Sequence, residues 1–344
     1  PAGHGSEGRL RRMSSRKPTI GILTGGGDCP GLNAVIRAAT KSAERLGYDV
    51  IGFLRGYEGL IEPVNYMPLD VRITADILLK GGTILGSSNK GRFTALVGEG
   101  KRVEIDPALL DQVARTVRQL GVVGLICVGG DGSLTIAQQL HEYGIPVVGV
   151  PKTIDNDLGG GDVILLPEIP WTFENICHKI REREAEGKRC TLIVAAEGAC
   201  LPGGGLVLGK NEPDELRQVR LGGIGVIVAD EIATRLGRDV RTVVLGHLQR
   251  GGTPTAFDRM LATEFGAHAV RLIHDGHFGE TVCYCPPEIK SAPILEAIRN
   301  LSTVNPRGSA VQAARALGIG FGDEADHCDP FRGCGPVAPE GGIA

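Results

Sequence analysis

Two short turns rich in glycine and aspartate, each directly following an apolar run, constrain the fold of this chain more than any other feature. They are Gly129–Ser133 (GGDGS) and Pro151–Asp157 (PKTIDND). The runs before them, Val122–Val128 and Pro146–Val150, are typical of buried strands in a parallel sheet. Because neighbouring parallel strands open on one crevice at their carboxyl ends, we expect both turns to lie there. Glycine lets a backbone approach a polyphosphate, and carboxylates beside it can bind Mg²⁺ or accept a proton, so the pair indicates phosphoryl transfer.

Strand and helix patterns alternate along the rest of the chain. Strands are expected at Thr19–Thr24, Asp49–Phe53, Val122–Val128, Pro146–Val150, Val163–Leu166, Thr191–Ala196 and Val240–Leu245. Helices are expected at Gly31–Leu46, Ile73–Lys80, from the Asp106 cap to Leu120, from the GGDGS turn to His141, and at Thr172–Glu186, Ile224–Leu236 and Pro254–His274. This alternation predicts an α/β fold of two Rossmann-like domains with doubly wound, mostly parallel sheets.

One join in this pattern is unusually short. The strands Pro146–Val150 and Val163–Leu166 are separated by little more than the Pro151–Asp157 turn, with no helix between them. A right-handed crossover between parallel strands takes a dozen or more residues and usually includes a helix. Either the two strands belong to different domains or a segment is missing.

Charge and cysteine content exclude several classes of protein. A net charge of −3 gives no reason to expect nucleic acid or an anionic membrane as partner. The nine cysteines show no zinc-ligand spacing, and their odd number argues against a disulfide framework. We therefore expect a reducing compartment, with Cys127 and Cys177 as buried free thiols. Residues 1–18 lack a secretory signal and predict a disordered leader, with a transit sequence as the weaker alternative, and residues 323–344 predict a disordered tail.

Three further glycine-rich turns could bind phosphate. In Thr24–Asn33 (TGGGDCPGLN) the amides of Gly26 and Gly27 precede a helix, although a plain strand-to-helix turn explains the same residues. Gly81–Ser88 (GGTILGSS) offers amides and hydroxyls, but is weak by itself. Gly204–Asn211 (GGLVLGKN) lacks the hydroxyl residue of a P-loop and is interpreted as a surface loop.

Acid–base and sugar-binding chemistry is indicated by polar residues at other strand ends. Asp155 is the better general base of its turn because neighbouring Asp157 raises its proton affinity, although an N-cap with an Asx-turn explains the pair equally well. An imidazole and a cation suited to a sugar phosphate follow the last predicted strand, at His247 and Arg250. Arg241 starts that strand, and Glu197 could accept sugar hydroxyls or be a solvated loop acid.

In combination these stretches resemble the 6-phosphofructokinase family over residues 19–322, most closely its ATP-dependent bacterial and cyanobacterial members. The resemblance implies phosphoryl transfer from ATP to the 1-hydroxyl of fructose 6-phosphate, a step of glycolysis, with Mg²⁺ as cofactor. It makes Asp155 the catalytic base and Asp131 the Mg²⁺ ligand. It assigns sugar-phosphate contacts to Thr153, Asp155, Asp157, Glu197, Arg241, His247 and Arg250, and nucleotide contacts to Gly26, Asn89, Lys90, Gly130, Asp131, Gly132 and Ser133.

The same resemblance implies further properties. Residues 19–158 would form the nucleotide-binding domain and 159–322 a truncated sugar-phosphate-binding domain. Gly132 favours ATP because pyrophosphate-using members carry Asp there, whereas Lys152 keeps a pyrophosphate-dependent phosphofructokinase as the alternative. Lys90 would supply a charge that some members take from Arg. A cytoplasmic homo-oligomer, dimer or tetramer, is implied, or a plastid protein if the leader is a transit peptide.

The chain departs from the family after Asp157. A segment of on the order of fifty residues, far more than a minimal crossover, is absent there; in the family it holds a helix, a strand with a sugar-phosphate Arg and a Met-Gly-Arg loop. We therefore expect this chain to bind substrate poorly or to be inactive. A non-catalytic nucleotide-binding or regulatory phosphofructokinase subunit is one alternative. An NAD or lipid kinase is another, since those families share the GGDG turn.

Overall fold

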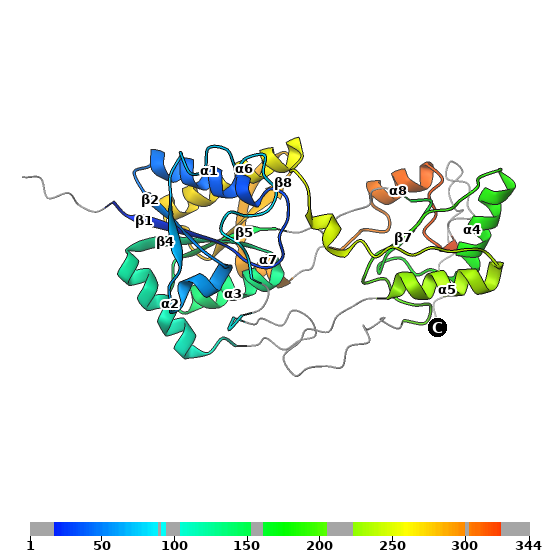
Figure 1. The fold of residues 1–344 in the computed structure, drawn as a ribbon, viewed down its shortest axis with the longest axis horizontal. Helices are drawn as coiled ribbons and strands as arrows, with labels where there is room; N and C mark the ends of the chain where they lie inside the picture. The colour runs from blue at the N-terminus through cyan, green and yellow to red at the C-terminus, as the bar shows by residue number, and fades with distance from the viewer. Residues whose placement is uncertain are drawn as a thin grey trace, which may run out of the picture. The chain divides into compact units, whose positions relative to one another are not determined.

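The computed structural model describes residues 17–88, 91–93, 104–152, 161–204, 223–299 and 303–324. It divides into two compact units, of which the first combines Pro1–Ile154 with Gln249–Asn300. The second unit combines Asp155–Leu248 with Leu301–Ala344 (Figure 1). The sequence predicts a truncated second domain over residues 159–322, with a crossing of the chain between domains as an option, and in the structure the chain returns to the first unit at Gln249.

The first unit is built on a seven-stranded sheet in the order β3-β2-β1-β4-β5-β8-β9. Strands β2, β1, β4, β5 and β8 run parallel to one another, and the edge strands β3 and β9 run antiparallel to β2 and β8. The strands are β1 Thr19–Thr24, β2 Asp49–Phe53, β3 Tyr66–Leu69, β4 Val122–Gly129, β5 Val147–Pro151, β8 Glu280–Cys285 and β9 Glu288–Pro293. The mostly parallel sheet confirms the predicted fold class.

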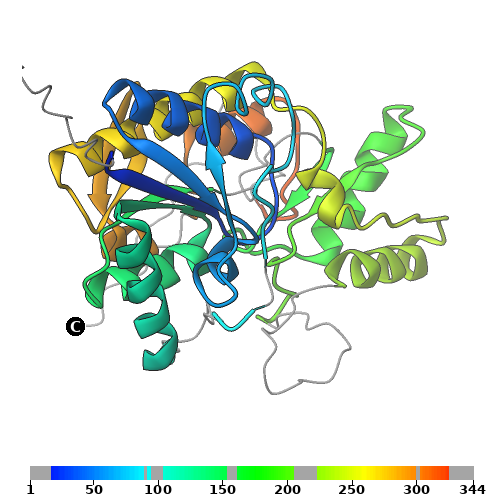
Figure 2. The same ribbon diagram turned by 60° about the vertical axis from the view of Figure 1, so that its left-hand side comes forward.

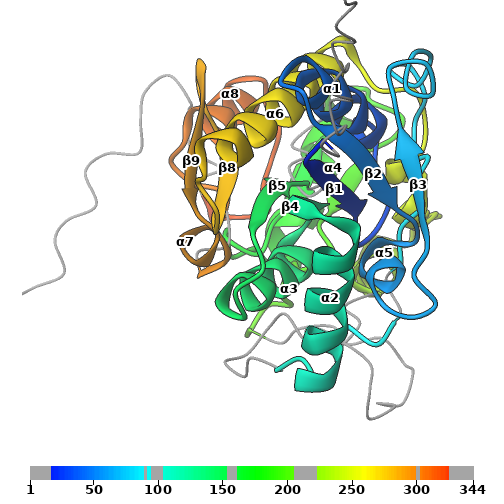
Figure 3. The ribbon, with the colours of Figure 1, turned by 90° about the vertical axis from the view of Figure 1, so that its left-hand side faces the viewer.

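Helices cover both faces of this sheet (Figures 2 and 3). On one face, Ile20 and Ile22 of β1 pack in a core with α1 and α6; on the other, Leu23 packs with α2, α3 and α7. Such double coverage explains why the central strands are apolar throughout. The helices are α1 Leu32–Arg45, α2 Pro107–Leu120, α3 Asp131–Glu142, α6 Ala256–Asp275 and α7 Ile294–Arg299, with the short 3-10 helix η1 Gly56–Leu60.

Side-chain caps fix where two of these helices begin. The Asp106 carboxylate accepts a 2.9 Å hydrogen bond from the Ala108 amide, and Pro107 occupies the first turn, as the sequence predicts. At the start of α6, Thr255 and Asp258 form a capping box, in which each side chain accepts a hydrogen bond from the other residue's amide. Both helices are therefore stabilised at their N-termini by side-chain hydrogen bonds.

The described part of the second unit contains a small parallel sheet and three α-helices. Strands β6 (Val163–Leu165) and β7 (Ile193–Ala195) pair in register, and Gly320 bridges to Val163. Its core gathers Val163, Leu165, Trp171 and Ile176. The helices are α4 Phe173–Ala185, α5 Ile224–Leu236 and α8 Ser309–Ala316. The 3-10 helix η2, Gly246–Arg250, follows α5 along the chain.

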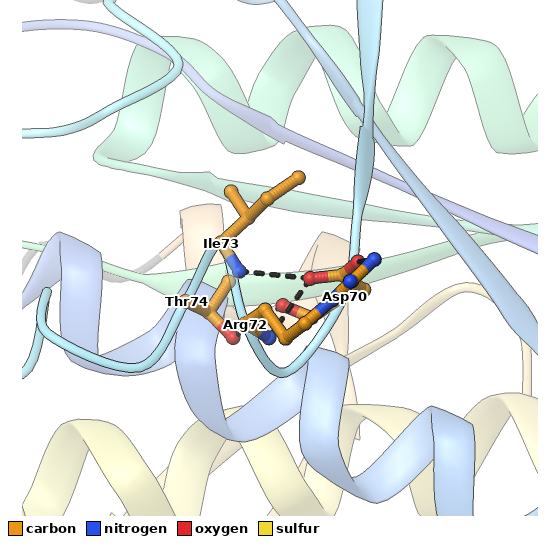
Figure 4. Close-up of polar contacts among 4 residues, drawn as sticks. All are labelled: Asp70, Arg72, Ile73 and Thr74. Atoms are coloured by element: carbon orange, nitrogen blue, oxygen red, sulfur yellow. Dashed lines mark hydrogen bonds and ion pairs between the residues drawn. The ribbon is translucent and has the colours of Figure 1, made fainter.

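The predicted helix at Ile73–Lys80 is wrong: the segment forms successive turns (Figure 4). Asp70 Oδ1 accepts hydrogen bonds from the amides of Arg72 and Ile73, both at 2.8 Å, and Thr74 Oγ1 donates to the Asp70 carbonyl. Ile73 and Leu79 are exposed, so no single apolar face forms. A segment this short does not sustain a helix without such a face.

The predicted strand at Val240–Leu245 is also wrong. These residues have no regular secondary structure, and Val243 and Val244 are 74% and 76% exposed. A strand needs a paired neighbour, and among the described residues of the second unit only β6 and β7 form a sheet. The run therefore has the β-branched, apolar side chains typical of a strand, but no neighbouring strand with which its backbone could pair.

Other expectations are confirmed or fall outside the described residues. All seven cysteines that the structure describes are free, and Cys127 and Cys177 are buried as predicted. Nearly all of the predicted leader, of the predicted tail and of the Gly204–Asn211 loop lies outside the described ranges. Within those ranges, no helix combines the length and apolar character needed to cross a membrane.

Candidate active site

Three turns meet at the carboxyl edge of the first sheet because the strands before them are neighbours. Strand β4 lies between β1 and β5, with Thr24 opposite Val128 and Gly129 opposite Pro151. Beyond the strands, the Gly25 amide donates to the Val128 carbonyl at 2.8 Å, and the Lys152 amide to the Gly129 carbonyl at 3.0 Å. The predicted convergence of the two opening turns is thus confirmed up to Lys152, the last described residue of the second turn.

Glycine is required in these turns by close packing around Ser133. A Cβ on Gly25 would lie 2.6 Å from Ser133 Oγ, and a Cβ on Gly129 would overlap the Ser133 side chain. Tyr57, from η1, is buried behind the turn and its hydroxyl donates a 2.7 Å hydrogen bond to the Ser133 carbonyl. The first turn of α3 is therefore held from two sides. Sequence analysis missed Tyr57, which follows a glycine with no motif to mark it.

The start of α3 places an exposed carboxylate beside the backbone amides of the first helical turn. Gly130 is its N-cap, Asp131 its first residue, and the Asp131 side chain is exposed. Gly132 and Lys152 belong to the turns at this same edge of the sheet, and both are half-buried. The amides at a helix N-terminus favour an anion, and an accessible carboxylate oxygen is the ligand type that Mg²⁺ prefers. Among the residues that the structure describes, no cluster of three or more His, Cys, Asp or Glu could hold a metal by itself.

The Gly81–Ser88 turn lies against the first loop. Asn33 Nδ2 donates to the carbonyls of Lys80 and Gly81, at 3.1 and 3.2 Å, and its Oδ1 accepts from the Ile84 amide. The Thr24 and Thr83 hydroxyls lie 3.0 Å apart. Asn33 is thus a buried structural tie between two candidate phosphate loops. Its place at the end of the TGGGDCPGLN stretch was visible in the sequence, but its partners were not.

Two cations reach the first loop. Lys152 Nζ donates a hydrogen bond to the Gly27 carbonyl, and the Arg250 guanidinium packs against Gly27. Burial raises the pKa of the neighbouring Cys29 thiol to about 11, even though Lys152 and Arg250 act in the opposite direction. Cys29 is therefore a protonated thiol at neutral pH, without the thiolate that a nucleophile needs.

The residues expected to bind the sugar phosphate are distributed over both units. Glu197 is exposed just after β7, and Arg241 is exposed and ion-paired at 3.6 Å with Asp239, both in the second unit. His247 lies in η2, and Arg250 belongs to the first unit. The other sugar-phosphate candidates, Thr153, Asp155 and Asp157, lie outside the described residues, as do the nucleotide candidates Asn89 and Lys90.

The fold and the turns at the sheet edge together define the class of this protein. It is an α/β protein with glycine-rich turns, of the kind that bind phosphate, at the carboxyl end of a doubly wound sheet. A model of the phosphofructokinase family matches residues 19–163 and 158–273. The ATP-dependent 6-phosphofructokinase of Chloroflexus aggregans is 40% identical over 365 residues, covering 91% of this chain and all of that enzyme. The chain belongs to the phosphofructokinase family. This excludes the NAD or lipid kinase alternative.

Further relatives differ in the donor that their names state. The pyrophosphate--fructose 6-phosphate 1-phosphotransferase of Amycolatopsis methanolica is 40% identical over 341 residues, covering 83% of this chain and 96% of that protein. Among solved structures, phosphofructokinase from Saccharomyces cerevisiae superposes with a TM-score of 0.66 at 24% identity, covering 82% of this chain and 45% of the yeast chain. That likeness confirms the fold.

The comparisons also bear on the predicted missing segment. The alignment with the Chloroflexus aggregans enzyme is 365 residues long, more than the 344 residues of this whole chain, so that relative carries residues that this chain lacks. The family model matches in two pieces that meet at residues 158–163. Both findings agree with the loss of a segment after Asp157.

Proposed function

We propose that this chain carries the donor half of a 6-phosphofructokinase, and that its reaction is phosphoryl transfer from ATP to the 1-hydroxyl of fructose 6-phosphate. The observation that carries the proposal is the meeting of three glycine-rich turns at one sheet edge, in a chain of this family. Catalysis of this kind rests on positioning and charge stabilisation rather than on covalent chemistry. A rigid edge lined with amides and cations suits that task.

The donor residues follow from this edge and from the resemblance. Amides of the first loop and of the start of α3 would bind the phosphates, with Asp131 holding Mg²⁺. When bound, that ion would neutralise charge on the transferring group. The full proposed donor set is Gly26, Asn89, Lys90, Gly130, Asp131, Gly132 and Ser133.

On the acceptor side, the proposed base is Asp155, which would take the proton of the sugar 1-hydroxyl while Asp157 keeps its proton affinity high. Thr153, Glu197, Arg241 and His247 would bind the sugar and its phosphate. Arg241 and Glu197 are exposed, as ligand-binding side chains must be before substrate arrives. We propose that the missing segment leaves this half incomplete and turnover impaired.

ATP is the proposed donor because Gly132 leaves space beside the nucleotide phosphates. The pyrophosphate alternative retains support from Lys152 and from relatives named for that donor. We further propose that the protein is a homo-oligomer and that it is located in the cytoplasm, with a plastid as the alternative. The free thiols of the described cysteines fit a reducing compartment.

Titration calorimetry and a turnover assay test the proposal on the full chain. We expect ATP to bind with Mg²⁺ present, and turnover with fructose 6-phosphate to be far below that of the Chloroflexus aggregans enzyme assayed beside it. Normal turnover would refute the impairment, and pyrophosphate binding without ATP binding would reverse the donor. The second candidate function is a non-catalytic subunit, and the expected loss of a segment after Asp157 is the reason to test it. ATP binding with no turnover, together with co-purification of a full-length phosphofructokinase, would favour this second function.

A further inference from the structure

The turn Gly81–Ser88 is fixed by side chains from the two elements that flank the first loop. The turn has no regular secondary structure, and most of its residues are half-buried. Asn33, in the first turn of α1, and Thr24, the last residue of β1, are 2% and 0% exposed. Both form hydrogen bonds with this turn, and the first loop lies between them in the sequence. The conformation of one candidate phosphate turn therefore depends on residues at the two ends of another.

The Asn33 amide is matched to three backbone groups at the start of this turn. Its two N–H groups donate to the Lys80 and Gly81 carbonyls at 3.1 and 3.2 Å. Its oxygen accepts from the Ile84 amide at 2.9 Å. Because a carbonyl only accepts and a backbone N–H only donates, the donor and acceptor of the side chain cannot be exchanged. Asparagine is therefore required here by hydrogen bonding as well as by volume, since an aspartate would set a carboxylate against two carbonyl oxygens.

Thr24 holds the other end of the turn. Its hydroxyl donates to the Gly86 carbonyl at 2.9 Å and lies 3.0 Å from the Thr83 hydroxyl. Because a hydroxyl has a single hydrogen, Thr83 is the donor in that second contact. Thr83 Oγ1 in turn accepts from the Leu85 amide at 3.2 Å. Two buried side chains thus fix both ends of the turn.

A turn held in this way is preorganised for a ligand. Removal of the Asn33 amide leaves carbonyls and an amide unpaired, which is costly, so the turn would move to hydrate them. The apparent affinity of a ligand falls in proportion to the fraction of molecules that keep the binding conformation. The turn leads directly to Asn89 and Lys90, two of the proposed nucleotide contacts. A displaced turn would therefore weaken donor binding even in a folded chain.

We propose that Asn33, supported by Thr24, is a positioning residue of the donor site, which holds the Gly81–Ser88 turn in the conformation that binds the phosphoryl donor. This deepens the proposed function and rests on it. Asn33 is buried and its amide is fully used by the turn, so it acts on the donor through the turn and not by contact.

Calorimetric titration of the full chain with ATP and with pyrophosphate, with Mg²⁺ present, tests this in Asn33→Ala and Asn33→Asp. The control is Thr40→Val, which removes a buried hydroxyl of the same helix that donates to the Ile36 carbonyl at 2.8 Å, away from the turn. We expect both Asn33 variants to weaken binding of the donor by about ten- to a hundredfold, as when the turn keeps its conformation in about 1–10% of molecules. Thr40→Val should bind as the unsubstituted chain does.

A pH profile tests the hydrogen bonds themselves. The pKa of the carboxyl group that Asn33→Asp introduces should be raised, because the group is buried beside two carbonyl oxygens. Protonation gives this group one O–H donor. As the pH falls from about 8 to about 6, the donor affinity of Asn33→Asp should therefore recover relative to the unsubstituted chain at the same pH. Asn33→Ala has no group to protonate and should not recover, and equal behaviour of the two variants would show that these hydrogen bonds do not hold the turn.

Three further outcomes would overturn the proposal. Unchanged donor affinity in both Asn33 variants would leave Asn33 a structural residue and the proposed function intact. An equal loss in Thr40→Val would show that any buried polar deletion in α1 has the same effect. If the unsubstituted chain binds neither ATP nor pyrophosphate, the proposed function fails and this inference fails with it.

Circular dichroism melting shows whether each variant is folded at the temperature of the titration. Where the Asn33 variants do not fold, Thr24→Val takes their place, because it removes the hydrogen bonds at the other end of the turn and keeps the shape of the side chain. It should weaken donor binding in the same direction, and an unchanged affinity in folded Thr24→Val would contradict the proposal.

Discussion

At the scale of single residues, the glycines of the β4 turn are set by contact distances. A Cβ on Gly129 would overlap Ser133 and lie 3.3 Å from the Gly25 carbonyl oxygen. We expect Gly129→Ala to destabilise the chain by about 1–3 kcal/mol, the cost of overpacking, and to abolish measurable ATP binding because the α3 amides move. Urea unfolding and calorimetry measure the two effects.

Gly225→Ala is the matched control for that change. Gly225 lies in α5, where among the described residues an added Cβ would approach Thr242 alone, at an ordinary contact distance of 3.4 Å. We expect no loss of stability there, since alanine is favoured over glycine in helices by roughly 0.5–1 kcal/mol. Equal destabilisation by both substitutions would show that the β4 turn is not tightly packed.

Buried thiols predict how stability changes with pH. Burial raises the pKa of Cys127 to about 12 and that of Cys29 to about 11, from an ordinary 9.0. Above pH 9 the unfolded chain loses these protons while the folded chain keeps them. Stability should therefore be full below pH 9 and fall as pH rises toward 11–12, by up to about 1.4 kcal/mol per pH unit for each thiol.

Urea unfolding at pH 8, 9 and 10 measures that slope. In Cys127→Ala the decline between pH 9 and 10 should be shallower, because one of the two thiols no longer titrates. Tyr57, whose pKa burial also raises well above its ordinary value, adds to the decline only above pH 10. Stability that is constant up to pH 10 would contradict the burial of both thiols.

The sequence could not predict which residues form hydrogen bonds or packing contacts with the residues of the candidate site. The residues Asp131 and Ser133 were marked by their turn, but Tyr57 and Asn33 became visible only through hydrogen bonds spanning 76 and 47 positions. The contact of Arg250 with Gly27 was likewise not visible in the sequence, and its expected role beside a sugar phosphate stays a prediction. Such contacts depend on how distant elements pack, which local patterns do not encode.

At the scale of elements, α1 and α6 pack so closely that a glycine is needed between them. A Cβ on Gly266 would lie 2.5 Å from the Val35 carbonyl oxygen and 2.9 Å from the Ala38 Cβ. We expect Gly266→Ala to cost about 1–3 kcal/mol of unfolding free energy, because backbone cannot yield as a side-chain tip can. Glu264→Ala, on the exposed side of the same helix, should stay within about 0.5 kcal/mol. Urea unfolding compares them; similar costs would contradict the close approach.

Elements with strong local signals were predicted well, and those defined by their partners were not. Thr19–Thr24, Asp49–Phe53 and Ile224–Leu236 have the predicted bounds because apolar runs and glycine ends mark them. Strand β9 (Glu288–Pro293) is polar, ends in proline and pairs only with β8, so nothing local identifies it. The predictions for Ile73–Lys80 and Val240–Leu245 were wrong for the opposite reason. Each segment has the local pattern of a helix or a strand, but the first has no apolar surface to pack against and the second has no strand to pair with.

At the scale of the whole molecule, the two units differ in completeness. The first has a seven-stranded sheet covered on both faces, while the described second unit has two strands of three residues each. Small sheets of this kind need further strands or packed helices to be stable. We propose that the exposure of Val243 and Val244 and the expected loss of a segment after Asp157 have one cause, a sheet that lacks a strand.

Restoring the segment should therefore bury residues 242–245. We expect a chimera carrying the corresponding segment of the Chloroflexus aggregans enzyme after Asp157 to turn over fructose 6-phosphate and to protect the amides of these residues in hydrogen exchange. In the present chain the same amides should exchange rapidly, because unpaired backbone opens at little cost. Peptides from β4 serve as the internal reference, since that strand is already complete and its protection should not change. If 242–245 are protected equally in both chains, the exposed run is not the site of the lost strand, and the impairment must come from the lost side chains alone.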